Sequence, residues 1–100
     1  MPAYLIVTAV LHDRPAFLEG YGAAAAKLVG KMGGRYRLMR PDGEVLEGAG
    51  PSPVSVVIEE WPDKAAVMAF WNSPEYAEVR KLRDGLADCR VVLVEAPEPL

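Results

Sequence analysis

Trp71–Tyr76, with the sequence WNSPEY, marks the end of one predicted helix and the start of another. Asn72 suits the position that closes a helix. Ser73 can cap the next helix, because its side-chain oxygen can accept a hydrogen bond from a backbone N–H of the first turn. Pro74 suits the first helical position, where its missing N–H is not needed. The stretch therefore predicts a joint between two helices, the second running from about Pro74 to about Leu86.

The segments on either side of this joint predict one helix and two strands. Asp63 is a good N-cap for a helix that contains Phe70 and other apolar residues at helical spacing. Val54–Trp61 lies before that helix and is strongly β-prone, and Arg90–Ala96 is a second β-prone segment after the joint. Residues 97–100 fit a non-repetitive tail.

The first third of the chain predicts a strand followed by a long helix. Ala3–Leu11 is almost continuously apolar, as is typical of a strand that is covered on both faces. Asp13 can cap a helix, and Gly33-Gly34 can end it, because glycine adopts the left-handed conformation that closes a last turn. We expect this helix to run from about Arg14 to about Met32.

The middle of the chain predicts a hairpin and a loop. From Arg35 the side chains alternate between polar and apolar, until Pro41–Gly43 supplies a turn. Glu44–Glu47 can continue as a short return strand. The glycines and prolines of Gly48–Pro53 break any regular element, so we interpret this run as a loop.

The resulting order is β, α, β, β, α with an extra short helix, β. This order is typical of an α+β ferredoxin-like fold, a βαββαβ antiparallel sheet with its helices on one face. We expect residues 1–96 to form a single domain, with residues 97–100 as a C-terminal tail.

The second face of that sheet has no predicted cover. Ala3–Leu11, Val54–Trp61 and Arg90–Ala96 place valine, leucine or isoleucine on both faces, whereas the helices can cover only one. A large exposed apolar patch is unusual on a small soluble protein. The economical cover is a second copy of the same sheet, related by a two-fold axis. The sequence therefore predicts a homodimer in which two sheets face each other, as in a dimeric α/β barrel.

The composition argues against several classes of partner. The 100 residues carry a formal net charge of −3 and no Lys/Arg cluster, so neither nucleic acid nor an anionic membrane is expected as a partner. The apolar run at Ala3–Leu11 has no basic leader before it and is too short to span a bilayer. Cys89 is the single cysteine, so no internal disulfide can form, which fits a cytoplasmic protein.

Tyr76, Arg80 and Arg83 form the strongest candidate site. At about 100° per residue their side chains share one stripe of a helix. Arginine offers a planar fork that fits a carboxylate, and the tyrosine hydroxyl can orient an enolate-like oxygen. We predict Tyr76 and Arg83 as catalytic and ligand-binding residues, and Arg80 and Tyr21 as further ligand-binding residues. The alternative is structural, with Tyr76 at the edge of the core, Arg80 paired to Asp84 and Arg83 paired to another carboxylate.

His12 is the remaining catalytic candidate. It is the only histidine, it ends a strand beside Asp13, and an imidazole titrates near neutrality, so it can shuttle a proton. The favoured alternative is a surface loop residue beside a capping aspartate. With one histidine, one cysteine and scattered carboxylates, we expect no metal site and no cofactor.

Several of these features together are similar to a known family. The most specific are Ser73-Pro74-Glu75-Tyr76 with Arg80 and Arg83, and weaker ones are Tyr4, Asp13, Tyr21, Gly33-Gly34, Glu44–Gly48 and Val57–Glu59. On these residues nearly the whole chain resembles the domain-of-unknown-function family numbered 1330, within the dimeric ferredoxin-like α/β-barrel superfamily. It departs from the family at Pro41–Gly43, where a glycine-rich turn is expected. The resemblance implies a barrel of two facing sheets but no agreed reaction, since the superfamily includes cofactor-free monooxygenases, lactone isomerases, dye-decolourising peroxidases and haem-degrading enzymes.

The sequence thus predicts a homodimer that binds a small organic molecule and acts as a cofactor-independent isomerase or monooxygenase. The arginines favour an anionic ligand. The alternative is a non-catalytic dimeric structural or interaction module with no ligand pocket. An open, partly polar cavity beside Tyr76 and Arg83 would favour the ligand-binding protein, and close packing there would favour the module.

Overall fold

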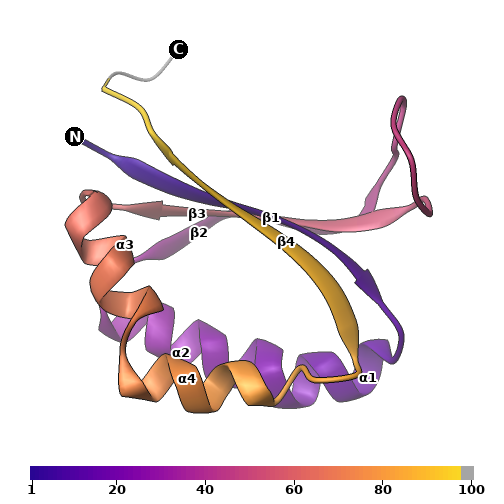
Figure 1. Ribbon diagram of the computed structural model, residues 1–100, viewed down its shortest axis with the longest axis horizontal. Helices are drawn as coiled ribbons and strands as arrows, with labels where there is room; N and C mark the ends of the chain where they lie inside the picture. The colour runs from indigo at the N-terminus through magenta and orange to yellow at the C-terminus, as the bar shows by residue number, and fades with distance from the viewer. Residues whose placement is uncertain (98–100) are drawn as a thin grey trace.

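The computed structural model describes residues 1–97, in which four antiparallel strands form one sheet with its helices on one side (Figure 1). The strands are β1 (Ala3–Leu11), β2 (Arg35–Gly43), β3 (Val54–Trp61) and β4 (Ala87–Glu95), and they lie in the order β2-β3-β1-β4. The helical segments are α1 (Arg14–Phe17), η1 (Leu18–Gly22), α2 (Ala23–Lys31), α3 (Lys64–Trp71) and α4 (Pro74–Lys81). The predicted α+β ferredoxin-like fold is confirmed. No helix among residues 1–97 is long and apolar enough to cross a membrane.

The long helix predicted after β1 forms, with one irregular turn in its middle. Asp13 caps its start, where the side chain accepts a hydrogen bond from the Ala16 backbone N–H at 3.1 Å. The five residues of η1 then form a π-helical turn between α1 and α2. Such a turn holds one residue more than an α-helical turn and is frequent at functional sites. The periodicity of the apolar residues predicted the helix but not the extra residue in this turn, which shifts the spacing of the side chains that follow it.

Two glycines end this helix, and each has a separate reason. Gly33 has a φ of +102°, the left-handed conformation that closes a helix. The Gly34 backbone N–H then donates to the Val29 carbonyl oxygen at 2.9 Å. A Cβ atom on Gly34 would lie 2.6 Å from the indole ring of Trp61. The predicted end at Gly33-Gly34 is confirmed, and the second glycine also makes room for a core tryptophan.

The hairpin between β2 and β3 differs from the prediction. Pro41–Gly43 was expected as a turn, but it continues β2, and Gly43 pairs with Val54 after an irregularity in the register. Gly43–Val54 is the last residue pair between β2 and β3. No strand residue therefore lies opposite Glu44–Glu47, and the predicted short return strand does not form. Residues 44–53 instead form a loop that projects from the sheet on the side away from the helices (Figure 1).

The joint at Trp71–Tyr76 forms as predicted, but the second helix is shorter. Asn72 closes α3, and the Ser73 hydroxyl oxygen accepts a hydrogen bond from the Tyr76 backbone N–H at 3.0 Å. Helix α4 ends at Lys81 rather than Leu86, and hydrogen-bonded turns follow it. The last strand accordingly begins at Ala87, three residues before the predicted Arg90, and pairs there with the end of β1. Of the predicted tail, residues 98–100 lie outside the described residues.

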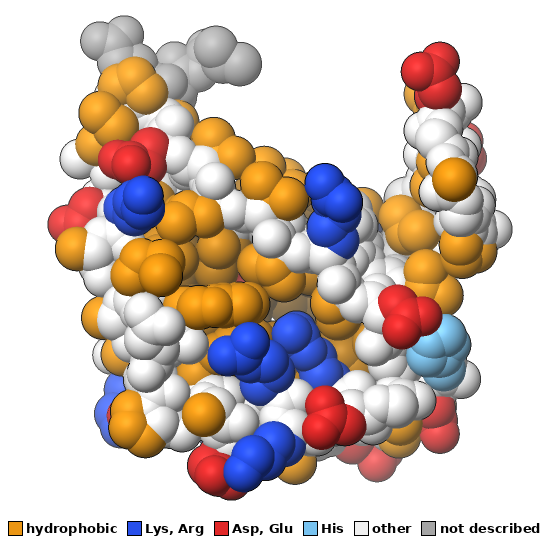
Figure 2. Space-filling view, viewed as in Figure 1, with side chains coloured by type: hydrophobic (Ala, Val, Ile, Leu, Met, Phe, Trp, Pro, Cys, Tyr) orange, Lys and Arg blue, Asp and Glu red, His pale blue; other side chains and the backbone are white. Residues whose placement is uncertain are grey.

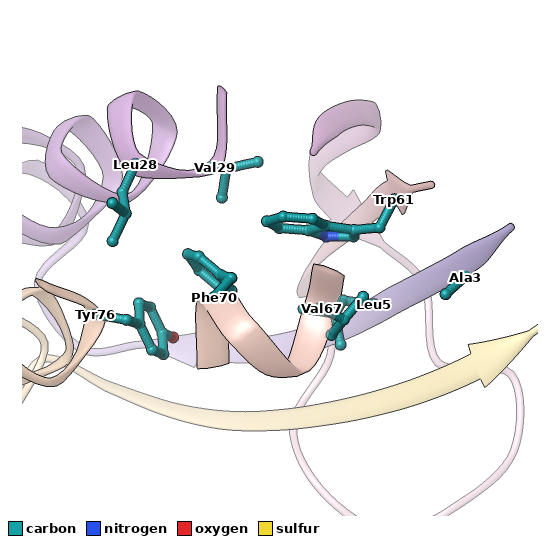
Figure 3. Packing of buried hydrophobic residues seen from close by; sticks show 8 residues of the cluster. All are labelled: Ala3, Leu5, Leu28, Val29, Trp61, Val67, Phe70 and Tyr76. Atoms are coloured by element: carbon teal, nitrogen blue, oxygen red, sulfur yellow. The ribbon is translucent and has the colours of Figure 1, made fainter. Parts of the chain in front are cut away.

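The core lies between the helices and the end of the sheet where β1 begins and β3 ends (Figure 3). Its buried members are Ala3, Leu5, Leu28, Val29, Trp61, Val67, Phe70 and Tyr76. We call Trp61, Phe70 and Tyr76 the aromatic core. The ring centroids of Trp61 and Phe70 are 5.0 Å apart, and those of Phe70 and Tyr76 are 4.4 Å apart. These contacts fill the space over this end of the sheet.

The other face of the sheet carries a row of apolar side chains. Ile6 of β1 lies opposite both Ile58 of β3 and Val92 of β4. Leu38 is 41% exposed and Val92 is 40% exposed. We call this surface the open sheet face. Strands that are apolar on both faces are therefore present as predicted, and the helices cover only one of them (Figure 1).

Candidate functional site

A cavity of about 420 Å³ lies between the sheet and the helical segments α1, η1 and α2. We call it the helix–sheet cavity. Its walls are largely apolar and include Val7, Leu11, Phe17, Met39 and Val57. In the space-filling view, basic side chains gather beside a hollow that hydrophobic side chains surround (Figure 2). The size and the apolar walls with a few polar groups are typical of a site for a small molecule.

The cavity occupies the part of the sheet that the aromatic core leaves uncovered. Glu59 of β3 pairs with Leu5 of β1, and Ser55 pairs with Ala9. Glu59 and Ser55 both line the cavity, so it extends along the strands from the level of Leu5 toward the end of β1. The helices above it carry Gly22, which has no side chain, and Ala25 and Ala26, whose side chains are single methyl groups, so the space stays open.

Tyr21 lies in the π-helical turn and connects the cavity to the core. Its hydroxyl is 2.8 Å from the Tyr76 hydroxyl, and Nη1 of Arg83 donates a hydrogen bond to it at 3.3 Å. Both contacts are satisfied when Tyr21 accepts from Arg83 and donates to Tyr76. Burial raises the pKa of Tyr21 far above its ordinary value, more than the Arg83 charge lowers it. Tyr21 is therefore a neutral phenol at physiological pH.

Arg83 brings a positive charge to the wall of the cavity. Its guanidinium carbon lies 5.1 Å from the centre of the Tyr21 ring, a distance typical of a cation–π contact. No carboxylate among residues 1–97 forms an ion pair with Arg83. The guanidinium can thus hold the anionic group of a ligand.

Tyr76 and Arg80 do not line the cavity. Tyr76 is 2% exposed and belongs to the aromatic core, with its hydroxyl directed at Tyr21. The Arg80 guanidinium stacks 4.6 Å from the Trp71 ring and 5.1 Å from the Tyr76 ring. The described residues show no ion pair between Arg80 and Asp84, which the structural alternative had required. The predicted stripe is therefore divided, and only Arg83 of its three residues lines the cavity together with Tyr21.

His12 lies on the surface outside the cavity. Its Nε2 is 3.0 Å from a carboxylate oxygen of Asp88, and about half of the His12 side chain is exposed. Cys89, by contrast, lines the cavity, and burial raises the pKa of its thiol. The described residues contain no group of three or more His, Cys, Asp and Glu that could hold a metal ion.

Glu59 is a further cavity residue, and it is not among those predicted from the sequence. It is 8% exposed, and its carboxylate accepts a hydrogen bond from Nε1 of Trp61 at 3.1 Å. Burial raises its pKa, although the Trp61 hydrogen bond opposes the shift. Tyr36 pairs with it across β2 and β3, and burial and the Glu59 charge raise the pKa of Tyr36. The available signal was the alternation of β3, which places this acid on the same face as Val57 and Trp61.

A four-stranded antiparallel sheet with helices on one face and a ligand-sized cavity between them defines a ferredoxin-like α+β protein. A family model described as Domain of unknown function (DUF1330) matches residues 2–97. The chain therefore belongs to this family, as the resemblance in sequence implied. No curated protein matches the sequence.

Several solved structures share the fold. A protein of unknown function from Rhodopseudomonas palustris, RPA0582, has 22% identity and a TM-score of 0.78, over 98% of this chain and 84% of that chain. SnoaB, a cofactor-independent oxygenase from Streptomyces nogalater, has 18% identity and a TM-score of 0.70, over 99% and 96%. A dimeric ferredoxin-like protein of unknown function from Jannaschia sp. CCS1 has 16% identity and a TM-score of 0.69, over 96% and 100%. At these identities the likeness establishes the fold alone.

Proposed function

We propose that this protein is a homodimer that binds a small organic anion in the helix–sheet cavity and acts on it without a cofactor, as a monooxygenase or an isomerase. The observation that carries this proposal is the position of Arg83. Its guanidinium lines an apolar cavity of about 420 Å³ and contacts a neutral phenol instead of a carboxylate. An anionic ligand would supply the missing negative charge.

In this proposal the candidate residues have different roles. Arg83 binds the anionic group, and the Tyr21 hydroxyl orients it from the adjacent wall. Tyr76 acts through its hydrogen bond to Tyr21, and Arg80 supports the Tyr76 ring. His12 does not line the cavity, so any proton that His12 shuttles must enter or leave the cavity from outside. The cavity counts against a non-catalytic module without a ligand pocket.

The dimeric part of the proposal rests on the open sheet face. Its apolar row would be covered by the same face of a second copy, with a two-fold axis between them. The Jannaschia relative in structure is itself described as dimeric. A hollow of about 330 Å³ under the loop at residues 44–53 opens on this same face, and a second copy would cover it. The single cysteine supports a cytoplasmic location.

The binding site can be tested with 2-naphthoate, an aromatic anion, and 2-naphthol, a neutral phenol with the same rings. We expect Arg83→Ala to weaken 2-naphthoate binding by about tenfold to 100-fold, because a hydrogen bond to a charged group contributes about 1.5–3 kcal/mol. Binding of 2-naphthol should change much less. Isothermal titration calorimetry measures both affinities.

Two further variants control this experiment. Arg35→Ala removes an exposed arginine outside the cavity and should leave the affinity unchanged. Val57→Phe fills the cavity and should weaken both ligands. Equal 2-naphthoate affinity in wild type and Arg83→Ala would exclude Arg83 as the anion site.

The catalytic part needs its own measurement. Oxygen uptake with 1,4-dihydroxy-2-naphthoate, in the presence of a metal chelator, should exceed the rate in buffer if the protein is a monooxygenase. An isomerase would change the absorbance spectrum of the probe without oxygen uptake. If this probe binds in the cavity but neither signal appears, the protein is a binding protein and not an enzyme for this class of compound.

A further inference from the structure

We propose that the Tyr21 hydroxyl is a hydrogen-bond donor of the helix–sheet cavity, and that together with Arg83 it selects acids with an oxygen atom next to the carboxylate. This inference rests on the proposed function, because it assumes that Arg83 holds the anion. It adds the class of ligand, an aromatic acid with a hydroxyl or oxo group on the carbon beside the one that bears the carboxylate.

The first argument is the direction of the hydrogen bond between the two tyrosines. Among residues 1–97, the buried Tyr76 hydroxyl has one hydrogen-bond partner, the Tyr21 hydroxyl at 2.8 Å, and either can donate. Donation from Tyr21 suits Tyr21 but leaves the Tyr76 proton without an acceptor, which is unfavourable in a core. In the reverse arrangement the Tyr21 oxygen accepts from both Tyr76 and Arg83, one bond for each of its two lone pairs. The Tyr21 proton is then free for a ligand that accepts it.

The second argument is the place and the protonation state of Tyr21. The residue lines the cavity together with Arg83 and is only partly buried, so a ligand can reach it. Burial raises the pKa of Tyr21, and the phenol therefore keeps its proton at physiological pH. The wall of the cavity thus presents a neutral donor, the Tyr21 hydroxyl, directly beside a cationic donor, the Arg83 guanidinium.

The third argument is the spacing of these two donors. Nη1 of Arg83 lies 3.3 Å from the Tyr21 hydroxyl oxygen, so two ligand oxygens that bind these donors must be neighbours. In an aromatic acid with an adjacent hydroxyl, that hydroxyl donates to its own carboxylate, and such a hydrogen bond is about 2.5–2.7 Å long. The hydroxyl oxygen then has lone pairs for an outside donor, and Tyr21 provides that donor. A hydroxyl at the far end of the ligand lies too far from the carboxylate to bind beside Arg83.

The test compares three acids by isothermal titration calorimetry: 1-hydroxy-2-naphthoate has an adjacent hydroxyl, 6-hydroxy-2-naphthoate a distant one and 2-naphthoate none. We expect wild type to bind the first about threefold to tenfold more tightly than the other two, the gain from one hydrogen bond between neutral groups. In Tyr21→Phe this preference should disappear, while 2-naphthoate still binds. Tyr36→Phe is the matched control, because it removes the hydroxyl of another cavity tyrosine, and it should keep the wild-type preference.

The outcomes separate this inference from the proposed function. If wild type binds all three acids equally and Arg83→Ala weakens them, the role of Tyr21 is wrong while the anion site stands. The same holds if Tyr21→Phe keeps the preference, or if 6-hydroxy-2-naphthoate gains as much as its isomer. If no acid binds to wild type, the proposed function fails and the inference fails with it. Circular dichroism identifies a Tyr21→Phe variant that has lost the fold, and the comparison of the three acids on wild type then decides.

Discussion

The aromatic core and the helix–sheet cavity lie over the same sheet face, yet one is filled and the other is hollow. Over the first residues of β1, the Phe70 ring packs between Trp61 and Tyr76, with its centroid 5.0 Å from that of Trp61 and 4.4 Å from that of Tyr76. Over the later residues the helices present Gly22, Ala25 and Ala26, and a cavity of about 420 Å³ remains. The contrast teaches that packing for stability and space for a ligand are placed at opposite ends of one layer.

The strongest test of this contrast replaces one phenylalanine at each end. Phe70→Ala removes a ring that is 2% exposed and should lower the free energy of unfolding by about 3–5 kcal/mol. Phe17→Ala, at the cavity wall, should cost only about 1–2 kcal/mol, because its ring is half-buried and borders empty space. Urea unfolding of both variants measures the difference. Equal losses would mean that the cavity end carries as much stability as the core.

A second test adds a methyl group instead of removing a ring. Gly34→Ala places a Cβ atom against the Trp61 indole and should destabilise the protein by about 1–3 kcal/mol. Gly30→Ala lies in helix α2 with open space around it and should stabilise by about 0.5–1 kcal/mol. Thermal unfolding of the two variants gives shifts of opposite sign. A harmless Gly34→Ala would contradict the close packing of Trp61.

The smallest expected effect is a pH dependence that arises at the cavity. Burial raises the pKa of Glu59 in the folded state, so the folded protein holds this proton more tightly than the unfolded chain. The associated stability is therefore present below the unfolded pKa of about 4.3 and is lost as pH rises through the folded pKa. Glu59→Gln should be less sensitive to this rise than wild type.

Urea unfolding at a series of pH values measures this difference. Because only one proton is involved, the free energy of unfolding changes only modestly with pH. Glu19→Gln, in the same chain but outside the cavity, is the matched control and should follow wild type. Parallel curves for wild type and Glu59→Gln would show that the carboxyl does not lose solvent on folding.

Sequence predicted the fold well where short-range chemistry decides it. The caps at Asp63 and Ser73 depend on hydrogen bonds to a backbone N–H three residues away, and both form. The hairpin tip depended on long-range pairing. Gly43 opposite Val54 extends β2 through the expected turn, and no local pattern contains that contact.

The candidate site was only partly predictable, for a related reason. The stripe of Tyr76, Arg80 and Arg83 assumed a helix to Leu86, but α4 ends at Lys81, so Arg83 lies beyond the helix and leaves the stripe. Glu59 was missed because two glutamates stand side by side in β3. The alternation of β3 places Glu59 on the face of Val57 and Trp61 and Glu60 on the other, but only the folded structure shows that the Glu59 face lies at the cavity.

The π-helical turn at Leu18–Gly22 also bears on how this chain can lengthen or shorten. Because the turn holds one residue more than an α-helix requires, a single deletion there could restore a regular helix without breaking it. The deletion would leave α1 and α2 in place, because the wide turn absorbs the extra residue, and would change which side chain of the turn lies beside Arg83. Relatives that are one residue shorter in this segment should therefore place a different side chain beside the arginine and accept different ligands.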